Sequence, residues 1–183
     1  MEPRMDRGPW TQTYSGKQFF PLDPDVEDID IEDIAHSLSM ICRFNGHCRA
    51  FYSVAQHSVL VSQVCEETSL AAARWGLLHD AAEAYVGDVV RPIKAILEDF
   101  QMVEEHLANV VARRFFADHS AEVQAAVRLA DDQLLATELD QLMSTPPHPW
   151  LLTCAPLTIP IDPMSPDVAK ALFLARFHEL FAG

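Results

Sequence analysis

The chain has 183 residues, with 13 Lys and Arg against 27 Asp and Glu, which gives a formal net charge of −14. Proteins that bind nucleic-acid polymers gain affinity by replacing phosphate counterions with Lys and Arg, so this acidic composition argues against a polynucleotide or an anionic membrane surface as a partner. Apolar residues make up 49% of the sequence, enough to bury the core of one globular domain.

The compartment is predicted from the first residues and from the cysteines. The opening sequence MEPRMDRGPW scatters charges through the region where a signal peptide would be apolar. No apolar run reaches the roughly 20 residues that a membrane span requires. The four cysteines form no C-x-x-C pair and are too few for a disulfide framework. We therefore expect a cytoplasmic protein with reduced thiols.

Residues 1–32 are expected to form an extended segment that packs on the domain or leads into it, because Pro and Gly interrupt them repeatedly. Residues 23–33 hold seven of the acidic side chains. This acidic stretch is expected to be a solvated linker that feeds a helix, since Asp and Glu favour helix N-termini, or alternatively to take part in an interface. Residues 33–183 are assigned to one domain.

From residue 33 onward, apolar residues recur at helical spacing and predict an all-α bundle of five to seven helices. The expected helices cover residues 33–42, 54–64, 69–85, 92–111 and 120–143, with a last helix after Ser165. The last helix has a strong start, because a serine that can cap is followed by Pro166 at its first turn. A short strand pair is expected within residues 151–161, near the C-terminal third.

Four side chains of the metal-binding type lie inside these apolar helical patterns. They are His57, His79, Asp80 and Asp131. Asp131 shares its helix face with Val127, Leu134 and other apolar residues, and an ionised carboxylate there costs several kcal/mol unless something compensates it. One such Asp alone would suggest a buried ion pair. Two histidines and two aspartates on three helices instead favour a divalent cation, which imidazole and carboxylate ligands satisfy together.

Glu83 follows His79 by four residues, a spacing that places both on one face of a continuous helix. A carboxylate beside a metal site can accept a proton from water or orient it. The alternative is an exposed helix acid that forms a surface salt bridge. Spacing alone does not separate the two interpretations.

With these residues identified, the sequence resembles the HD-domain metal-dependent phosphohydrolases. The segment HDAAEAYVGDVVRPIK, residues 79–94, is similar to the H-D-x-x-E-x-x-x-x-D-x-x-x-P-x-K pattern of 5′-deoxynucleotidases and related phage deoxynucleoside triphosphate hydrolases. Residues 33–58 add the Arg-aromatic pair found upstream of the first metal histidine, and LADDQLLATE, residues 129–138, resembles the helix that supplies the last ligand. The likeness spans residues 33 to about 180.

The resemblance implies a compact HD-domain helical bundle and a role for each matching residue. His57, His79, Asp80 and Asp131 would bind one divalent transition metal ion, namely Mn, Co, Zn or Fe. Glu83 would activate or position the attacking water. No other histidine has the spacing of a second-site pair, so a single ion is expected.

The same resemblance implies a nucleotide pocket. Asp88 would act in catalysis and lie near the sugar, where relatives sense the missing 2′-hydroxyl group. Arg43 would face the phosphate or the sugar, Phe44 would take the place of an aromatic residue that is often Trp, and Lys94 is a further phosphate candidate. Because Phe44 lacks the indole N–H, sugar and base selectivity do not carry over directly.

The expected activity is hydrolysis of a deoxynucleoside 5′-mono- or triphosphate by a metal-activated water, with a small-molecule nucleotide as partner and a homo-oligomer as an open possibility. Two alternatives remain: a metal-stabilised binding or regulatory module without turnover, and a phosphohydrolase of a non-deoxy nucleotide. The presence of Glu83 and Asp88 favours an enzyme, because a purely structural metal needs neither. The sequence leaves open the metal, the base preference and the choice between mono- and triphosphate.

Overall fold

The computed structural model describes residues 7–182, and the predicted all-α class is confirmed. The helices are α1 (Ile31–Met40), α2 (Val54–Glu66), α3 (Leu70–Leu78), α4 (Glu83–Val86), α5 (Arg91–Lys94), α6 (Glu98–Phe115), α7 (Ala121–Leu142) and α8 (Pro166–Phe181). Within the described residues, six of them have nine residues or more, and α4 and α5 are single turns.

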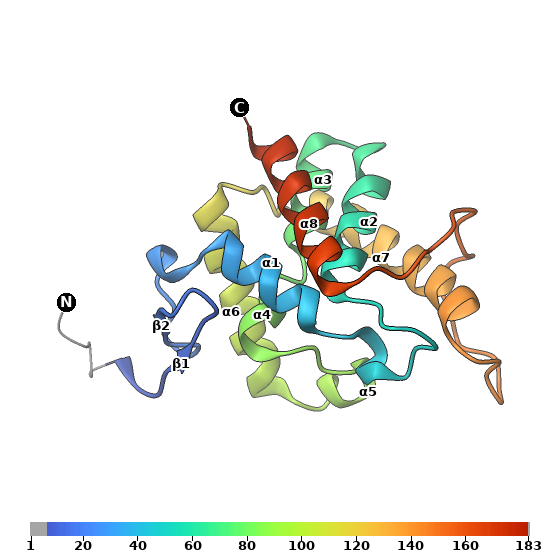
Figure 1. The fold of residues 1–183 in the computed structure, drawn as a ribbon, viewed down its shortest axis with the longest axis horizontal. Coiled ribbons are helices and arrows are strands. Elements are labelled where there is room, and N and C mark those ends of the chain that lie inside the picture. The colour runs from blue at the N-terminus through green and yellow to red at the C-terminus, as the bar shows by residue number, and fades with distance from the viewer. Residues whose placement is uncertain (1–6, 183) are drawn as a thin grey trace.

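Helix α2 lies at the centre of the bundle, where it packs against α1, α3, α7 and α8 (Figure 1). Most of its residues are buried, including the polar Gln56, His57 and Ser58. Helix α1 packs on α8 and α4, so the two ends of the domain meet on one side of α2. The site described below is therefore built around a helix that solvent barely reaches.

A glycine allows α2 and α3 to come close together. A Cβ atom at Gly76 would lie 3.2 Å from the Sγ of Cys65 and 3.2 Å from the Cα of Ser62, both on α2. These distances are tighter than ordinary van der Waals contacts, so any larger residue would push the two helices apart. The close approach matters because each of these helices leads to one histidine of the site.

The single helix predicted for residues 69–85 is wrong. Helix α3 ends at Leu78, and a new one-turn helix, α4, begins at Glu83. Between them, the N–H groups of Ala81 and Glu83 donate to the carbonyl oxygens three residues earlier, at 3.0 Å each, in place of the usual i−4 acceptors. His79 and Glu83 therefore do not share the face of a regular helix.

The long helix predicted from Pro92 is also interrupted. Helix α5 ends at Lys94, and Leu97 has a non-helical ψ of 74° before α6 begins. At this break the carbonyl oxygen of Lys94 accepts two bonds, from the N–H of Leu97 at 3.1 Å and from the Nε2 of Gln101 at 2.6 Å. By contrast, α7 and α8 follow Ser120 and Ser165, as predicted.

The short strand pair lies in a different place from the one predicted. Strand β1 (Thr11–Gln12) pairs antiparallel with β2 (Gln18–Phe19), whereas residues 151–161 contain no strand. The backbone of this later segment instead bonds to side chains of α7. The N–H groups of Leu157 and Ile161 donate to Thr137 and Gln141, both at 2.8 Å. These bonds use the groups that a strand ladder would need.

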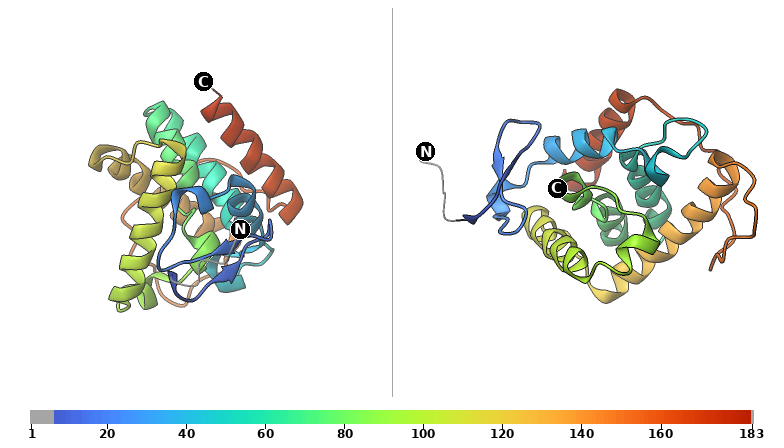
Figure 2. Two further views of the ribbon diagram at one scale, coloured as in Figure 1. Left: turned by 90° about the vertical axis from the view of Figure 1, so that its left-hand side faces the viewer. Right: turned by 90° about the horizontal axis from the view of Figure 1, so that it is seen from below.

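Residues 7–30 lie along one side of the bundle, at the left of Figure 1 and facing the viewer in the left view of Figure 2. Phe19, Phe20 and Ile29 are buried. The acidic stretch is folded rather than a solvated linker: Asp30 caps α1 and bonds to Lys17 at 2.7 Å, and the buried Asp33 accepts a bond from the Ser15 hydroxyl at 2.8 Å. Helix α1 therefore begins at Ile31, inside this stretch.

Candidate metal centre and adjoining cavity

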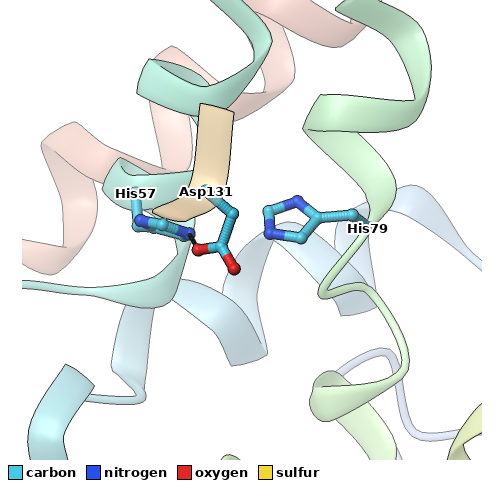
Figure 3. Close-up of side chains that lie close together, drawn as sticks. All are labelled: His57, His79 and Asp131. Atoms are coloured by element: carbon cyan, nitrogen blue, oxygen red, sulfur yellow. Dashed lines mark ion pairs between the residues drawn. The ribbon is translucent and has the colours of Figure 1, made fainter. Parts of the chain in front are cut away.

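Three side chains from three helical regions converge at the centre of the bundle (Figure 3). His57 comes from α2, His79 directly follows α3, and Asp131 comes from α7. One ligand atom from each lies within 4.8 Å of the others, so the three could hold a metal ion together. His57 Nε2 and Asp131 Oδ1 are 3.2 Å apart.

Asp80 adds a second carboxylate to this cluster. Its Oδ2 lies 3.2 Å from the Nε2 of His79 and 3.7 Å from the Nε2 of His57. Ligand atoms about 2.05 Å from a tetrahedral cation stand about 3.3 Å from one another, so these separations suit a shared ion. The structure thus brings together all four residues that the sequence singled out as ligands.

The two histidines present unpartnered nitrogens to the cluster. Both Nε2 atoms are buried and form no hydrogen bond within the described residues. The other ring nitrogen, Nδ1, is hydrogen-bonded in both histidines. The Nδ1 of His57 is 2.6 Å from Glu138, and the Nδ1 of His79 is 2.7 Å from the carbonyl oxygen of Gly76. Such outer bonds favour a proton on Nδ1, so Nε2 is the nitrogen that would bind a cation. The donor set therefore fits a metal ion.

Glu138 is fully buried and connects the cluster to two other polar side chains. Its Oε1 accepts bonds from His57 and from the Tyr52 hydroxyl, the latter at 2.9 Å. Its Oε2 accepts from Arg43, with Nε at 3.1 Å and Nη2 at 3.0 Å. Burial raises the pKa of a carboxyl, but Arg43 and His57 outweigh it, so the pKa of Glu138 lies below its usual value. The buried charge is therefore compensated.

The protein's own charges keep both aspartates of the cluster ionised. Burial opposes ionisation, yet His79 and His57 lower the pKa of Asp80, and the same two histidines with Arg43 lower that of Asp131. For His57, burial and Arg43 lower the pKa, but Glu138 and Asp131 raise it to about 9. Two ionised carboxylates beside two imidazoles form a site with high affinity for positive charge.

The ion pair considered for Asp131 also exists. Arg91 Nη2 lies 2.8 Å from Asp131 Oδ2, and Nη1 lies 3.1 Å from Asp132 Oδ1. Asp131 therefore uses its two oxygens differently, Oδ1 toward His57 and Oδ2 toward Arg91. Because the Arg91 side chain is 60% exposed, this pair does not by itself compensate the buried part of the cluster.

Glu83 is buried rather than exposed, so its interpretation as a surface acid is wrong. Only 6% of the residue is accessible, and its Oε2 has no hydrogen-bond partner among the described residues. Burial, together with the negative charges of Asp80 and Asp88, raises the pKa of Glu83 well above its usual value. Lys94 is the nearest cation, 3.8 Å from Oε1. Buried carboxyls with a raised pKa are typical of groups that transfer protons.

A cavity of about 340 Å³ opens beside the cluster. It is lined by Arg43, Phe44, Asp80, Glu83, Asp88, Val89, Val90, Arg91, Pro92, Lys94, Asp131, Leu135 and Trp150. All the residues predicted to bind substrate or act in catalysis lie on this wall. Asp88 follows Gly87, whose φ of +83° ends α4 in a conformation that favours glycine. Burial, with the charge of Asp80, raises the pKa of Asp88.

Two predicted phosphate-binding cations already have partners in the cavity wall. Arg43 bonds to Glu138 and lies 3.8 Å from Asp80 through Nη1. Lys94 bonds to Glu104 at 2.7 Å. The guanidinium carbon of Arg43 lies 5.5 Å from the ring centroid of Phe44. The backbone of Phe44 has a φ of +55°. The paired carboxylates fix the positions of both cations at the wall.

Sequence reasoning missed three residues here: Glu138, Arg91 and Trp150. A signal for Glu138 exists, because it lies seven residues after Asp131 and so two helical turns along the same face of α7. Arg91 and Trp150 have no comparable signal. Their positions depend on where residues 87–91 and 144–153 run in the folded chain.

The fold and the cluster define an all-α protein with a histidine–aspartate site that could hold a metal ion. The chain is 38% identical over 172 residues to the uncharacterized protein YfdR of Escherichia coli (strain K12), which covers 92% of this chain and 94% of that protein. It is 33% identical over 190 residues to the uncharacterized protein RCAP_rcc00048 of Rhodobacter capsulatus, and this alignment covers 93% of this chain and 95% of that protein. The chain belongs to the family that contains these two proteins. No protein-family model matches it.

The sequence predicts no membrane-spanning segment. None of the helices in residues 7–182 combines the length and the apolar composition that crossing a bilayer demands.

Proposed function

We propose that the protein is a metal-dependent phosphohydrolase of the HD type that acts on a small nucleotide, a deoxynucleoside 5′-mono- or triphosphate. The observation that carries this proposal is the pair of buried Nε2 atoms of His57 and His79, without hydrogen bonds, beside two carboxylates that also line a cavity with Glu83. The resemblance of residues 79–94 to HD phosphohydrolases supports the same assignment.

His57, His79, Asp80 and Asp131 would hold one divalent cation, Mn²⁺, Co²⁺, Zn²⁺ or Fe²⁺. When bound, such a cation supplies Lewis acidity that polarises phosphoryl oxygens and makes water nucleophilic near neutral pH. The protein's own contribution begins with the outer bonds, because Glu138 and Gly76 hold the two imidazole rings in place before any ligand arrives.

Glu83 is the general base in this proposal. When the carboxyl is ionised, its unpartnered Oε2 can accept a proton from the attacking water, and a raised pKa makes it a stronger base. Arg43 and Lys94 place positive charge on the cavity wall where phosphoryl oxygens gain negative charge. Asp88, which lines the same cavity, would accept a hydrogen bond from a sugar hydroxyl.

A metal-stabilised binding module without turnover is the competing interpretation, and the burial of Glu83 argues against it. Burying a carboxyl without a hydrogen bond for one oxygen destabilises the fold, and a structural metal site does not require it. The deoxyribose preference and a cytoplasmic location belong to the proposal as well.

The test is phosphate release by the purified full chain supplied with Mn²⁺, Co²⁺, Zn²⁺ or Fe²⁺. The substrates are dAMP, AMP, dATP and ATP, and the products are resolved as inorganic phosphate, pyrophosphate or tripolyphosphate. Release from a deoxynucleotide that depends on the cation and stops with a chelator supports the proposal. Stable metal binding without turnover of any of the four substrates would favour the binding module instead.

A further inference from the structure

The cavity beside the metal centre is lined by two chemically different sets of side chains. Its polar residues are Arg43, Asp80, Glu83, Asp88, Arg91, Lys94 and Asp131. Its remaining lining residues, Phe44, Val89, Val90, Pro92, Leu135 and Trp150, carry no polar side chain apart from the indole N–H. A ligand that matches this lining carries an anionic group for the polar residues and an apolar, preferably flat, group for the others.

Trp150 is the largest of these apolar lining residues, and it is 53% exposed. It makes no ring contact with another aromatic residue in the described part of the chain. An exposed tryptophan loses the stabilisation that burial would give, so its place in a cavity lining is informative. The indole is therefore accessible to a ligand in this cavity.

The loop that carries Trp150 is fastened near the metal centre. The hydroxyl of Thr153 donates to Asp132 Oδ2 at 3.1 Å, and Asp132 is the neighbour of the proposed ligand Asp131. Further along, the N–H of Leu157 donates to Thr137 on the same helix at 2.8 Å. The orange to red segment after α7 in Figure 1 is this loop. These bonds tie the segment that directly follows Trp150 to α7, the helix that carries Asp131.

We propose that Trp150 forms the base-stacking subsite of the nucleotide pocket, together with Phe44, which lines the same cavity. This inference rests on the proposed function, because it takes the phosphate to be at the metal centre. The nucleobase then packs its flat face on the indole. Aromatic residues that stack on bases contribute binding that depends on the ring face, which every base has.

The subsite therefore recognises the class of ligand rather than the individual base. Among its six residues, none has a carboxylate, amide or hydroxyl that could read the hydrogen-bonding edge of a base. Purine and pyrimidine nucleotides are expected to bind with affinities of the same order. Discrimination between ligands would then depend on the sugar and the phosphate, which meet the polar lining residues.

The test compares nucleotides with a ligand that lacks the base. Equilibrium binding of dAMP, dCMP and 2-deoxyribose 5-phosphate is measured by calorimetry on the full chain and on its Trp150→Ala and Trp150→Phe variants. We expect Trp150→Ala to weaken both nucleotides about 10-fold or more and to leave the sugar phosphate unchanged. Trp150→Phe should restore most of the loss, because phenylalanine keeps a flat ring. Trp10→Ala is the matched control, since Trp10 is equally exposed, at 55%, but does not line the cavity.

Equal weakening of all three ligands by Trp150→Ala would overturn the base subsite and point to a distorted cavity. Unchanged nucleotide binding in that variant would also overturn it. Both results leave the proposed function standing if the wild-type protein still hydrolyses deoxynucleotides. If the wild-type protein neither binds nor hydrolyses any nucleotide, the proposed function itself fails, and with it the subsite.

Discussion

Glu138 and His57 are joined by a 2.6 Å contact between a carboxylate oxygen and Nδ1, buried away from solvent. Glu138 also accepts bonds from Tyr52 and Arg43, so one carboxylate orients a proposed metal ligand and a proposed phosphate-binding cation. Because Oε1 faces His57 and Oε2 faces Arg43, this one carboxylate links the geometry of the metal centre to that of the cavity.

Glu138→Gln is expected to weaken metal binding by about 10- to 100-fold, because the amide is a poorer acceptor for the Nδ1 proton and leaves Arg43 without its counter-charge. The measurement is calorimetric titration of the metal-free chain with Zn²⁺. Glu122→Gln, an exposed position in the first turn of the same helix, is the control. Wild-type affinity in Glu138→Gln would show that the contact does not orient His57.

Asp80→Ala is expected to remove bound metal and activity together, because this carboxylate lies within 3.7 Å of both histidine Nε2 atoms. Metal content after dialysis, measured by atomic emission, checks the assignment. Asp132→Ala is the comparison, because Asp132 neighbours Asp131 but bonds to Arg91 and Thr153. A full complement of metal in Asp80→Ala would contradict its role as a ligand.

Glu83→Gln is expected to keep its metal and to lose turnover by roughly 10²-fold or more, as general-base removal does. The change should not lower the melting temperature. Burial raises the pKa of Glu83, so the fold stabilises its neutral form, and a neutral amide of the same shape avoids the cost of ionisation. Glu67→Gln, an exposed residue at the end of α2, serves as the control. Normal turnover in Glu83→Gln would remove it from the proposed mechanism.

Asp88→Asn is expected to reduce the discrimination between dAMP and AMP. The carboxylate lines the cavity immediately after α4, within reach of the same space as Arg43 and Phe44. A neutral amide is a weaker hydrogen-bond acceptor for a sugar hydroxyl than the carboxylate is. The ratio of the kcat/KM values for the two substrates is the measurement, and it should move toward one. An unaltered ratio would separate Asp88 from sugar recognition.

Metal affinity is expected to depend on pH through His57. In the metal-free protein, Glu138 and Asp131 raise the pKa of His57 to about 9, so the ring is protonated at pH 7. A ligand nitrogen must lose its proton before it binds, so the affinity should rise about tenfold per pH unit up to about pH 9 and then level off. Titrations in buffers of different ionisation enthalpy would detect the released proton.

The same shift has the opposite consequence for the metal-free fold. A raised pKa adds stability that is fully present below the unfolded value of about 6.5 and is lost as the pH rises through about 9. The melting temperature of the metal-free chain should therefore fall over this window as the His57 contribution is lost. A pH-independent metal affinity between pH 7 and 9 would contradict the assignment for His57.

The positions of the long helices could be predicted because their apolar faces and caps are local features. Ser120 and Ser165 marked two starts, and the face around Asp131 identified a carboxylate that needed compensation. The tight turns at His79 and Asp80 could not be predicted in this way, since the Ala- and Leu-rich residues around them favour a continuous helix. The position of the strand pair failed for a related reason: residues 151–161 bond to side chains of α7, and no local pattern shows that.

The burial of Glu83 could not be read from spacing either, because it depends on how α4 turns back toward the cluster after the helix break. The contacts of Arg91 and Trp150 likewise come from segments whose course is set by tertiary bonds. Residue type and sequence spacing were sufficient to single out the four side chains that cluster, His57, His79, Asp80 and Asp131. The side chains around the cavity required the folded chain.

Gly76 gives the metal centre a determinant that contains no ligand atom. It permits the close contact of α2 and α3, and its carbonyl oxygen accepts the Nδ1 proton of His79. The distance between the two imidazoles is thus set partly by the absence of a side chain one turn away. Cations differ in the ligand separations they accept, so relatives with a bulkier residue here would hold the histidines farther apart and favour a different metal ion.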